Sequence, residues 1–182
     1  MKPTLRPYRT EEGYWRMREL LRELFLLNGR LEWSWHVARL DYSRWHVCLN
    51  CAHVGLQDVA TLWELDGRLV AFLMPDGGPR EARLAVHPDV RTPELEEEML
   101  ALAEERLAAV RPDGSRRLCV RVPGQDDQLQ GLVRNRGYVQ EGWPEHQWRR
   151  DLDAASVIAD VPGPAGYVIR SLGDGLELLE RC

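Results

Sequence analysis

The spacing of apolar positions changes several times along the chain, from a helical repeat of three to four residues to strand-like alternation. In chain order the pattern predicts a strand at Thr4–Tyr8, helices at Glu11–Leu27 and Leu31–Val47, strands at Val59–Leu65, Arg68–Met74 and Arg80–Val86, a helix at Thr92–Val110, a strand at Arg117–Val122, a helix at Asp126–Arg136, and strands at Tyr138–Gly142 and His146–Leu152. Such an order of helices and strands predicts an α/β protein.

The two helices expected near the start differ in their apolar faces. The first has a single stripe, formed by Tyr14, Met17, Leu21, Leu24 and Phe25, and Asn28-Gly29 is typical of its end. The second has two stripes, one of Leu31, Trp35, Ala38, Tyr42 and Trp45 and one of Trp33, Val37 and Leu40. A helix that is apolar on two faces either packs in the core on both or faces a partner, and core packing is the preferred interpretation.

Local signals mark a hairpin and a long helix in the middle of the chain. Asp66-Gly67 separates two apolar runs, as in a two-residue hairpin turn. The strand at Arg80–Val86 is expected to continue this meander. Thr92 and Pro93 are typical of the first positions of a helix.

The composition changes after Asp153. Residues 1–153 are predicted to form one domain, and residues 154–165, with Pro162-Gly163-Pro164, a linker. Residues 166–182 are interpreted as the truncated start of a second domain or as a C-terminal strand. In the first interpretation a strand at Gly166–Arg170 is followed by helical sequence at Asp174–Arg181.

The composition is that of a soluble globular protein, with 44% hydrophobic and 29% charged residues in 182. A net charge of −5 argues against nucleic acid as a partner. Neither a membrane span of about 20 apolar residues nor a secretion signal is recognisable, so a cytoplasmic location is expected.

A short segment concentrates possible metal ligands: His46, Cys48, Cys51 and His53. Structural zinc sites draw four such ligands, usually from two pairs separated by a longer loop, and a second pair is missing here. A buried loop that carries reduced thiols is therefore the preferred interpretation, with a small Cys/His metal-binding domain as the alternative.

The strand expected to end at Val86 leads through a short turn into the helix at Thr92. Helix starts bind anions because they present unpaired N–H groups and the positive end of the helix dipole. The turn has no glycine, however, and four glutamates lie between Glu94 and Glu98. We expect these glutamates to form a solvated helix face. His87 is a candidate general base or, more simply, a surface or capping residue.

Three segments resemble the GNAT superfamily of acetyl-CoA-dependent N-acetyltransferases. They are LWELDGRLVAFLMP at Leu62–Pro75, VHPDVRTPELEEEML at Val86–Leu100 and LVRNRGYVQEG at Leu132–Gly142. The resemblance implies a GNAT-like α/β (α+β) fold, with a mixed, mostly antiparallel twisted sheet of six to seven strands and helices on both faces. It also implies transfer of an acetyl group from acetyl-CoA to an amine.

The resemblance also assigns roles to residues. The cofactor-binding loop would include Val86, Val90, Arg91 and Thr92, with Glu94 and Glu96 where the family has small residues that let a diphosphate approach the backbone. Two strands, Arg80–Val86 and Arg117–Val122, would diverge to admit the pantetheine arm of the cofactor. Val133 stands where the family often has a proton-donating tyrosine.

These substitutions predict a domain that resembles an N-acetyltransferase but lacks catalysis itself. One hypothesis is the degenerate N-terminal half of a tandem protein, with activity in a second GNAT-like domain beyond Cys182. The other is a non-catalytic structural or regulatory module. The expected partner is that second domain or another chain, and a homodimer is a further possibility.

Overall fold

The computed structural model describes residues 2–30, 35–76, 80–142 and 164–167 of the chain. It divides into two compact units, Met1–Gln140 and Glu141–Cys182. In the second unit the described residues include a turn, in which the Pro164 carbonyl accepts a hydrogen bond from the Tyr167 N–H. The turn includes Gly166, where a strand was predicted to begin. The strand predicted at His146–Leu152, most of the linker and the helical segment at Asp174–Arg181 lie outside the described residues.

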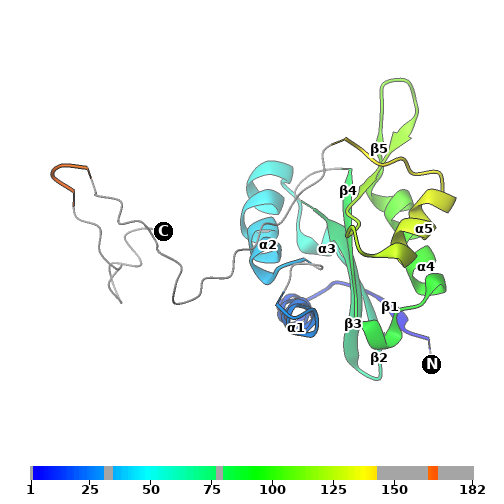
Figure 1. Ribbon diagram of the computed structural model, residues 1–182, viewed down its shortest axis with the longest axis horizontal. Helices are drawn as coiled ribbons and strands as arrows, with labels where there is room; N and C mark the ends of the chain where they lie inside the picture. The colour runs from blue at the N-terminus through cyan, green and yellow to red at the C-terminus, as the bar shows by residue number, and fades with distance from the viewer. Residues whose placement is uncertain (1, 31–34, 77–79, 143–163, 168–182) are drawn as a thin grey trace, which may run out of the picture. The chain divides into compact units, whose positions relative to one another are not determined.

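The first unit is a mixed α/β structure (Figure 1). Its elements are β1 (Thr4–Pro7), α1 (Glu11–Leu27), α2 (Val37–Tyr42), the π-helix η1 (Ser43–Ala52), α3 (Leu56–Val59), β2 (Thr61–Leu65), β3 (Arg68–Pro75), β4 (Glu81–Val86), the 3-10 helix η2 (Pro88–Val90), α4 (Pro93–Leu107), β5 (Ala109–Val110), β6 (Arg116–Arg117), β7 (Cys119–Val120) and α5 (Asp127–Asn135). One sheet has the order β1-β2-β3-β4-β7, antiparallel except for the parallel pair β4–β7, and β5 and β6 form a separate antiparallel pair.

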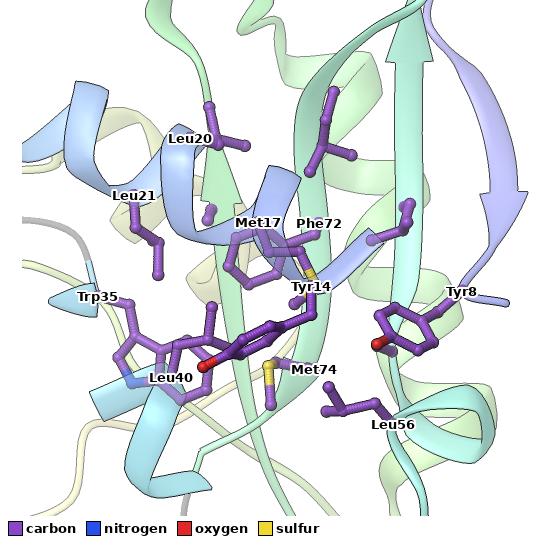
Figure 2. Packing of buried hydrophobic residues seen from close by; sticks show 14 of the residues in the cluster. Tyr8, Tyr14, Met17, Leu20, Leu21, Trp35, Leu40, Leu56, Phe72 and Met74 are labelled. Atoms are coloured by element: carbon purple, nitrogen blue, oxygen red, sulfur yellow. The ribbon is translucent and has the colours of Figure 1, made fainter. Parts of the chain in front are cut away.

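Helices cover both faces of the larger sheet, with α1 and α2 on one side and α4 and α5 on the other (Figure 1). Alternation along β3 supplies both cores, because Phe72 and Met74 pack towards α1 and Ala71 and Leu73 towards α4. Figure 2 shows the first core. Its buried members include Tyr14, Met17 and Leu21 of α1, Trp35, and Leu40 of α2. The predicted mostly antiparallel sheet with helices on both faces is confirmed.

The hairpin turn and the first helix follow their sequence signals. Asp66 and Gly67 have φ angles of 51° and 78°, the left-handed pair that a two-residue type I′ turn requires. The helix α1 covers the predicted residues, Glu11–Leu27. The first strand of the hairpin begins at Thr61 rather than Val59, because Leu56–Val59 forms the short helix α3.

The second helix differs from its prediction at both ends. The predicted range was Leu31–Val47, whereas α2 begins at Val37, after His36 accepts a hydrogen bond from the Ala38 N–H. It then continues without a break as η1 to Ala52, through the segment expected to be an irregular loop. Tyr42 and Trp45 are 57% and 56% exposed, so the expected burial on both faces is wrong for this part.

Three predicted elements in the second half are corrected. The long helix ends at Leu107 instead of Val110, because Ala109–Val110 pairs with Arg116–Arg117 as β5 and β6. The strand expected at Arg117–Val122 is divided between β6 and β7. Tyr138–Gly142 is not a strand, since the Tyr138 N–H bonds to the Val133 carbonyl and so closes the end of α5. None of the described helices is long and apolar enough to cross a membrane.

Candidate functional site

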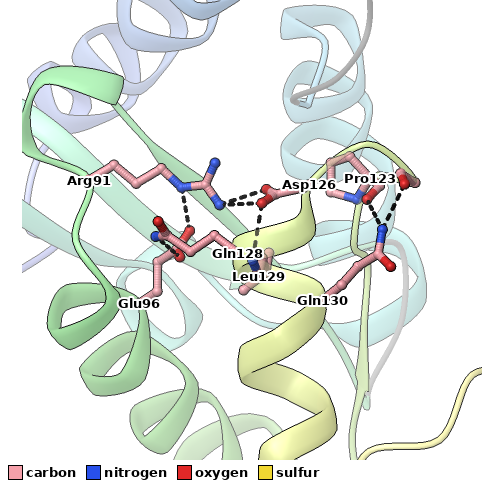
Figure 3. A network of polar contacts seen from close by, with 8 residues as sticks. Arg91, Glu96, Pro123, Asp126, Gln128, Leu129 and Gln130 are labelled. Atoms are coloured by element: carbon pink, nitrogen blue, oxygen red, sulfur yellow. Dashed lines mark hydrogen bonds and ion pairs between the residues drawn. The ribbon is translucent and has the colours of Figure 1, made fainter.

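The junction between β4 and α4 contains the residues to which the sequence assigned an anion site. Val86 ends β4, η2 forms the turn, and Thr92 is the N-cap of α4. The start of α5 lies against the same junction (Figure 3). The hydrogen-bond partners of the local N–H groups therefore decide whether an external anion can be held here.

The N–H groups of the turn are used within the turn. His87 accepts from the Asp89 N–H through Nδ1 at 3.2 Å and from the Val90 N–H through its carbonyl at 3.1 Å. The Arg91 N–H donates to the Pro88 carbonyl at 3.3 Å. A loop that receives a diphosphate has to point such groups outward, and these three point at their own chain.

The first turn of α4 is also satisfied internally. Pro93 has no N–H, and the Leu95 N–H donates to Thr92 Oγ1 at 3.2 Å. The Glu96 N–H donates to the Thr92 carbonyl at 3.1 Å. Interactions with its own backbone N–H and with the Thr92 hydroxyl lower the pKa of the Glu94 carboxyl, which favours its charged form at the start of α4. The N–H groups of Leu95 and Glu96 thus have hydrogen-bond partners within the chain.

Arg91, the one basic residue that matches the family motif, is held by two carboxylates (Figure 3). Its Nε donates to Glu96 Oε1 at 2.7 Å, and its terminal nitrogen to both oxygens of Asp126 at 2.7 and 2.6 Å. Gln128 donates to the other oxygen of Glu96 at 2.8 Å. Asp126 also caps α5 by accepting from the Leu129 N–H. We call Arg91, Glu96, Asp126 and Gln128 the Arg91 network.

The Arg91 network corrects one expectation about the glutamates of α4. Glu96 is 2% exposed and fully hydrogen bonded, so it is not part of a solvated helix face. Glu98 is also engaged, because it accepts from the Trp63 indole N–H and pairs with Lys2. These carboxylates are structural components of the junction.

The short strand β7 pairs only with the beginning of β4. Their register is Glu81 with Cys119 and Ala82 with Val120, and the Arg121 N–H donates to the Ala82 carbonyl. On the other side of β4, the Glu81 carbonyl accepts from the N–H of Asp76, which follows β3, and the His87 N–H donates to the Val70 carbonyl of β3. The backbone groups of every second residue of β4, counted from Glu81, therefore face β3. The backbone groups of Leu84 and Val86 consequently face the β7 side, beyond the end of the pairing with β7. The pairing thus ends where the resemblance implied that the two strands diverge.

His87 lies apart from the Arg91 network. It is 4% exposed and caps η2, so it is a capping residue but not a surface residue. Its Nε2 is 3.4 Å from Glu23 Oε1 of α1. A hydrogen bond from Arg68 is the main reason that the pKa of Glu23 is lowered. The structure thus directs the His87 ring towards α1 and not towards Arg91.

The position of the family's tyrosine is occupied by a core residue. Val133 packs in a cluster with Leu100 and Leu129 and has no proton to donate. The nearby Tyr138 hydroxyl donates to Glu104 at 3.0 Å. Burial first, and the charge of Glu104 second, raise the pKa of Tyr138, so this hydroxyl stays protonated as a packing partner of α4.

The four Cys and His side chains of η1 and its C-terminal end point to different partners. Cys48 is buried and Cys51 is exposed. His46 lies 3.8 Å from Cys51 Sγ, whereas His53 contacts the Leu49 carbonyl at 3.0 Å. No group of three or more His, Cys, Asp or Glu residues in the described part of the chain is arranged to hold a metal ion.

Sequence reasoning missed a buried carboxylate at the end of β3. Asp76 is 1% exposed and accepts from the Trp35 indole N–H at 3.0 Å, Arg39 Nε at 3.0 Å and Arg83 Nε at 3.1 Å. The carboxylate borders a pocket of about 350 Å³, lined by Trp35, Ala38, Arg39, Tyr42, Ser43 and Asp76. The sequence pattern indicates only a turn at Asp76. A signal was available in Arg83, a charged residue at an inward-facing position of a strand.

No family model and no curated protein matches the sequence. Among solved structures, the chain is similar to a ribosomal-protein-alanine N-acetyltransferase from Brucella melitensis biovar Abortus 2308, with 16% identity over 82% of this chain and 99% of that chain and a TM-score of 0.45. It is also similar to an aminoglycoside acetyltransferase from an uncultured soil metagenomic sample, solved with sisomicin (14% identity, 81% and 95% covered, TM-score 0.48). A possible acetyltransferase from Clostridium difficile 630 has 8% identity, 82% and 98% covered, and a TM-score of 0.49.

Proposed function

We propose that residues 1–140 form a GNAT-like domain that does not bind acetyl-CoA by its diphosphate and acts as a non-catalytic module. The supporting observation is the start of α4, where the N–H groups of Leu95 and Glu96 and the Arg91 guanidinium are engaged by the chain itself and the Glu94 carboxylate adds negative charge. The residues present at this place do not fit a diphosphate.

Electrostatics reinforce the geometry. The carboxylates of Glu94, Glu96 and Asp126 surround the place where negative charge would have to enter. Two like charges about 4 Å apart repel by about 4 kcal/mol at the effective dielectric typical of a protein surface. A diphosphate would have to displace these carboxylates from Arg91 before gaining any contact of its own.

The proposed role is to support or regulate a partner, which is either a second GNAT-like domain or another chain. Tyr42 and Trp45 are both exposed on the α2–η1 helix, where a partner could cover them. In a tandem arrangement the acetyl transfer would belong to the partner domain.

A second candidate function is N-acetyl transfer by this domain itself. It is favoured by one observation, the divergence of β4 and β7 beyond Ala82 and Val120. The backbone groups of Leu84 and Val86 on that side could pair with a pantetheine arm. Val86, Val90, Arg91 and Thr92 would then border the cofactor, but Arg91 would first have to leave Glu96 and Asp126.

Isothermal titration calorimetry distinguishes the two functions. The chain is titrated with acetyl-CoA and, separately, with S-acetylpantetheine, which lacks the diphosphate. The proposal predicts no saturable binding of acetyl-CoA to the natural chain. Tight, saturable binding of acetyl-CoA would refute it and favour the second candidate.

A variant tests the stated cause. The double substitution Glu94→Gly and Glu96→Gly removes both carboxylates and restores the small residues of the motif. We expect measurable acetyl-CoA binding in this variant, together with a higher melting temperature in the presence of ligand. Ala101→Gly, at an exposed position of α4, is the matched control for the helix propensity lost, about 1 kcal/mol per glycine. Equal behaviour of the double variant and the control would contradict the assigned cause.

A further inference from the structure

The π-helix η1 brings a thiol, an imidazole and an amide together outside the junction discussed above. A π-helix repeats near every fifth residue, so residues i and i+5 approach each other, and such segments are frequent at functional sites. His46 and Cys51 have this spacing, and their Nε2 and Sγ atoms are 3.8 Å apart. In an α-helix, five residues turn by about 140° and the two side chains would point apart.

Two neighbours orient the His46 ring. Asn50 lies with its side-chain amide 3.4 Å from His46 Nδ1. The amide atom nearest to Nδ1 is the Asn50 Nδ2 nitrogen. A 180° rotation of the amide brings its oxygen to the same position, and in the tautomer with the proton on Nδ1 the ring presents Nε2 to Cys51 as an acceptor. The Tyr42 ring stacks on the imidazole, with 5.0 Å between the ring centres and 29° between the ring planes. The imidazole is thus held with Nε2 facing the thiol, and in the tautomer protonated on Nδ1 it can accept the thiol proton.

Cys48, in the same helix, provides the contrast. Its side chain is 4% exposed, and burial raises the pKa of its thiol. Cys51 is exposed. One helix therefore holds a protected thiol and, three residues later, a thiol that is open to solvent and next to a base.

We propose that Cys51 is a site of reversible thiol modification by low-molecular-weight disulfides, with His46 as its base. The Cys51 thiol transfers its proton to His46 Nε2, and the thiolate sulfur attacks one sulfur of the disulfide. The new S–S bond forms as the old one breaks, and the departing thiolate takes the proton from the imidazolium. The products are a mixed disulfide on Cys51 and one free thiol.

The surroundings also determine how long the modification lasts. Because Cys48 is buried, it cannot reach the mixed disulfide unless η1 opens. The modification therefore persists until an external thiol removes it. It places a polar group next to His46, on which the exposed Tyr42 stacks, so it would alter the surface that the module offers to a partner.

The test uses the full chain, oxidised glutathione as the probe, and peptide mapping by mass spectrometry. The expected result near pH 7 is modification of Cys51 about tenfold faster than of the partly buried Cys119, with Cys48 unmodified. His46→Gln should slow the reaction of Cys51 about tenfold and leave Cys119 unchanged, and the difference should disappear near pH 9, where thiols ionise without a base. Equal rates for Cys51 and Cys119, or an unchanged rate at Cys51 in His46→Gln, would overturn the proposal.

A second comparison applies if His46→Gln disturbs η1, which modification of Cys48 would reveal. The rates in the natural chain are then followed from pH 9 to pH 6. A thiol assisted by His46 should lose less of its rate than Cys119 as the pH falls towards about 7, because the neutral imidazole still accepts its proton. Parallel pH profiles for the two cysteines would refute the assignment of His46.

Discussion

Replacement of Asp76 by alanine is expected to be among the most destabilising single changes in this protein. The Asp76 carboxylate has no exposed surface, and its partner Arg83 keeps only 14% of its side chain exposed. Burial is the main reason that the pKa of the Arg83 guanidinium is lowered, and the charge of Asp76 counteracts that effect. Without Asp76, Arg83 would remain as a buried charge without its counter-ion. Arg39 is 42% exposed and can turn to water instead.

The magnitude can be worked from the two groups that are left behind. Removal of one partner of a buried ion pair costs about 3–5 kcal/mol. The Trp35 indole N–H also loses its acceptor, which costs about 1–3 kcal/mol where water cannot replace it. These costs overlap, because water that enters the vacated space serves both groups. We therefore expect a loss of about 3–5 kcal/mol in the free energy of unfolding, or a fall of about 10 °C in the melting temperature.

Urea denaturation followed by tryptophan fluorescence measures this loss, with Asp76→Asn as the isosteric comparison. Asparagine keeps an acceptor for Trp35 and removes only the charge, so a smaller loss is expected. The double variant Asp76→Ala with Arg83→Met removes both buried charges and should be more stable than the sum of the single changes predicts, by about 1–3 kcal/mol. A loss below about 1 kcal/mol in Asp76→Ala, or strict additivity in the double variant, would refute the reasoning.

Two further predictions concern the acid limb of stability and the hairpin turn. Hydrogen bonds from Arg136 are the main cause of the lowered pKa of Glu104 in the folded protein. Ionised Glu104 therefore stabilises the fold fully above the ordinary glutamate pKa of about 4.3, and this contribution is lost as the pH falls through the lower pKa of the folded state. Glu104→Gln should therefore lower the free energy of unfolding at pH 7 and make it fall less steeply below about pH 4.3. Acid titrations followed by circular dichroism measure this, and an unchanged dependence of stability on acid pH would contradict the prediction. Gly67→Ala should cost about 1 kcal/mol in urea denaturation because Gly67 has a φ of 78° in the turn, whereas Gly124→Ala, where an added methyl group meets nothing within 4 Å, should be nearly neutral. Equal effects of the two alanines would contradict the assigned turn geometry.

The parts of the fold that could be predicted are those determined by local chemistry. The helix α1 has one apolar stripe and an Asn-Gly end signal, and both of its ends agree with the prediction. Asp66-Gly67 can adopt the backbone of a hairpin turn at low cost, and Thr92 with Pro93 marks the start of α4. In these places helix or turn propensity, capping residues and the apolar period all favour the same structure, and the tertiary contacts favour it too.

The failures depend on contacts between distant residues. Asp76 lies in a segment rich in glycine and proline, and its hydrogen-bond donors come from positions 35, 39 and 83, which a turn signal cannot reveal. Tyr138 follows a helix end and has the β propensity of a strand residue, although its hydroxyl bonds to Glu104 of α4. The apolar pattern of Ser43–Ala52 likewise did not indicate that this segment, η1, would form a π-helix. Tertiary hydrogen bonding decided the first two of these cases.

The candidate site was only partly predictable for the same reason. The sequence showed that glutamates replace the small residues of the family motif, and this led to the expectation of a degenerate cofactor loop. It did not show that Glu96 would be buried, nor that Asp126 from another helix would hold Arg91 from the other side. The divergence of β4 and β7 was equally invisible, because it depends on where a parallel pairing stops.

The Arg91 network also affects how the proposed loss of an anion site should be understood. If the glutamates merely blocked a preformed site, glycine at one position would reopen it. Arg91 however joins α4 to α5 through Glu96 and Asp126, and Asp126 caps α5 by accepting from Leu129. The arginine that the family motif directs to a phosphate here stabilises the contact between two helices. Reopening therefore needs the removal of Glu96, which frees the Nε of Arg91, as well as the removal of Glu94. A Glu94→Gly variant alone should bind acetyl-CoA no better than the natural chain, whereas the double glycine variant should show the first detectable affinity.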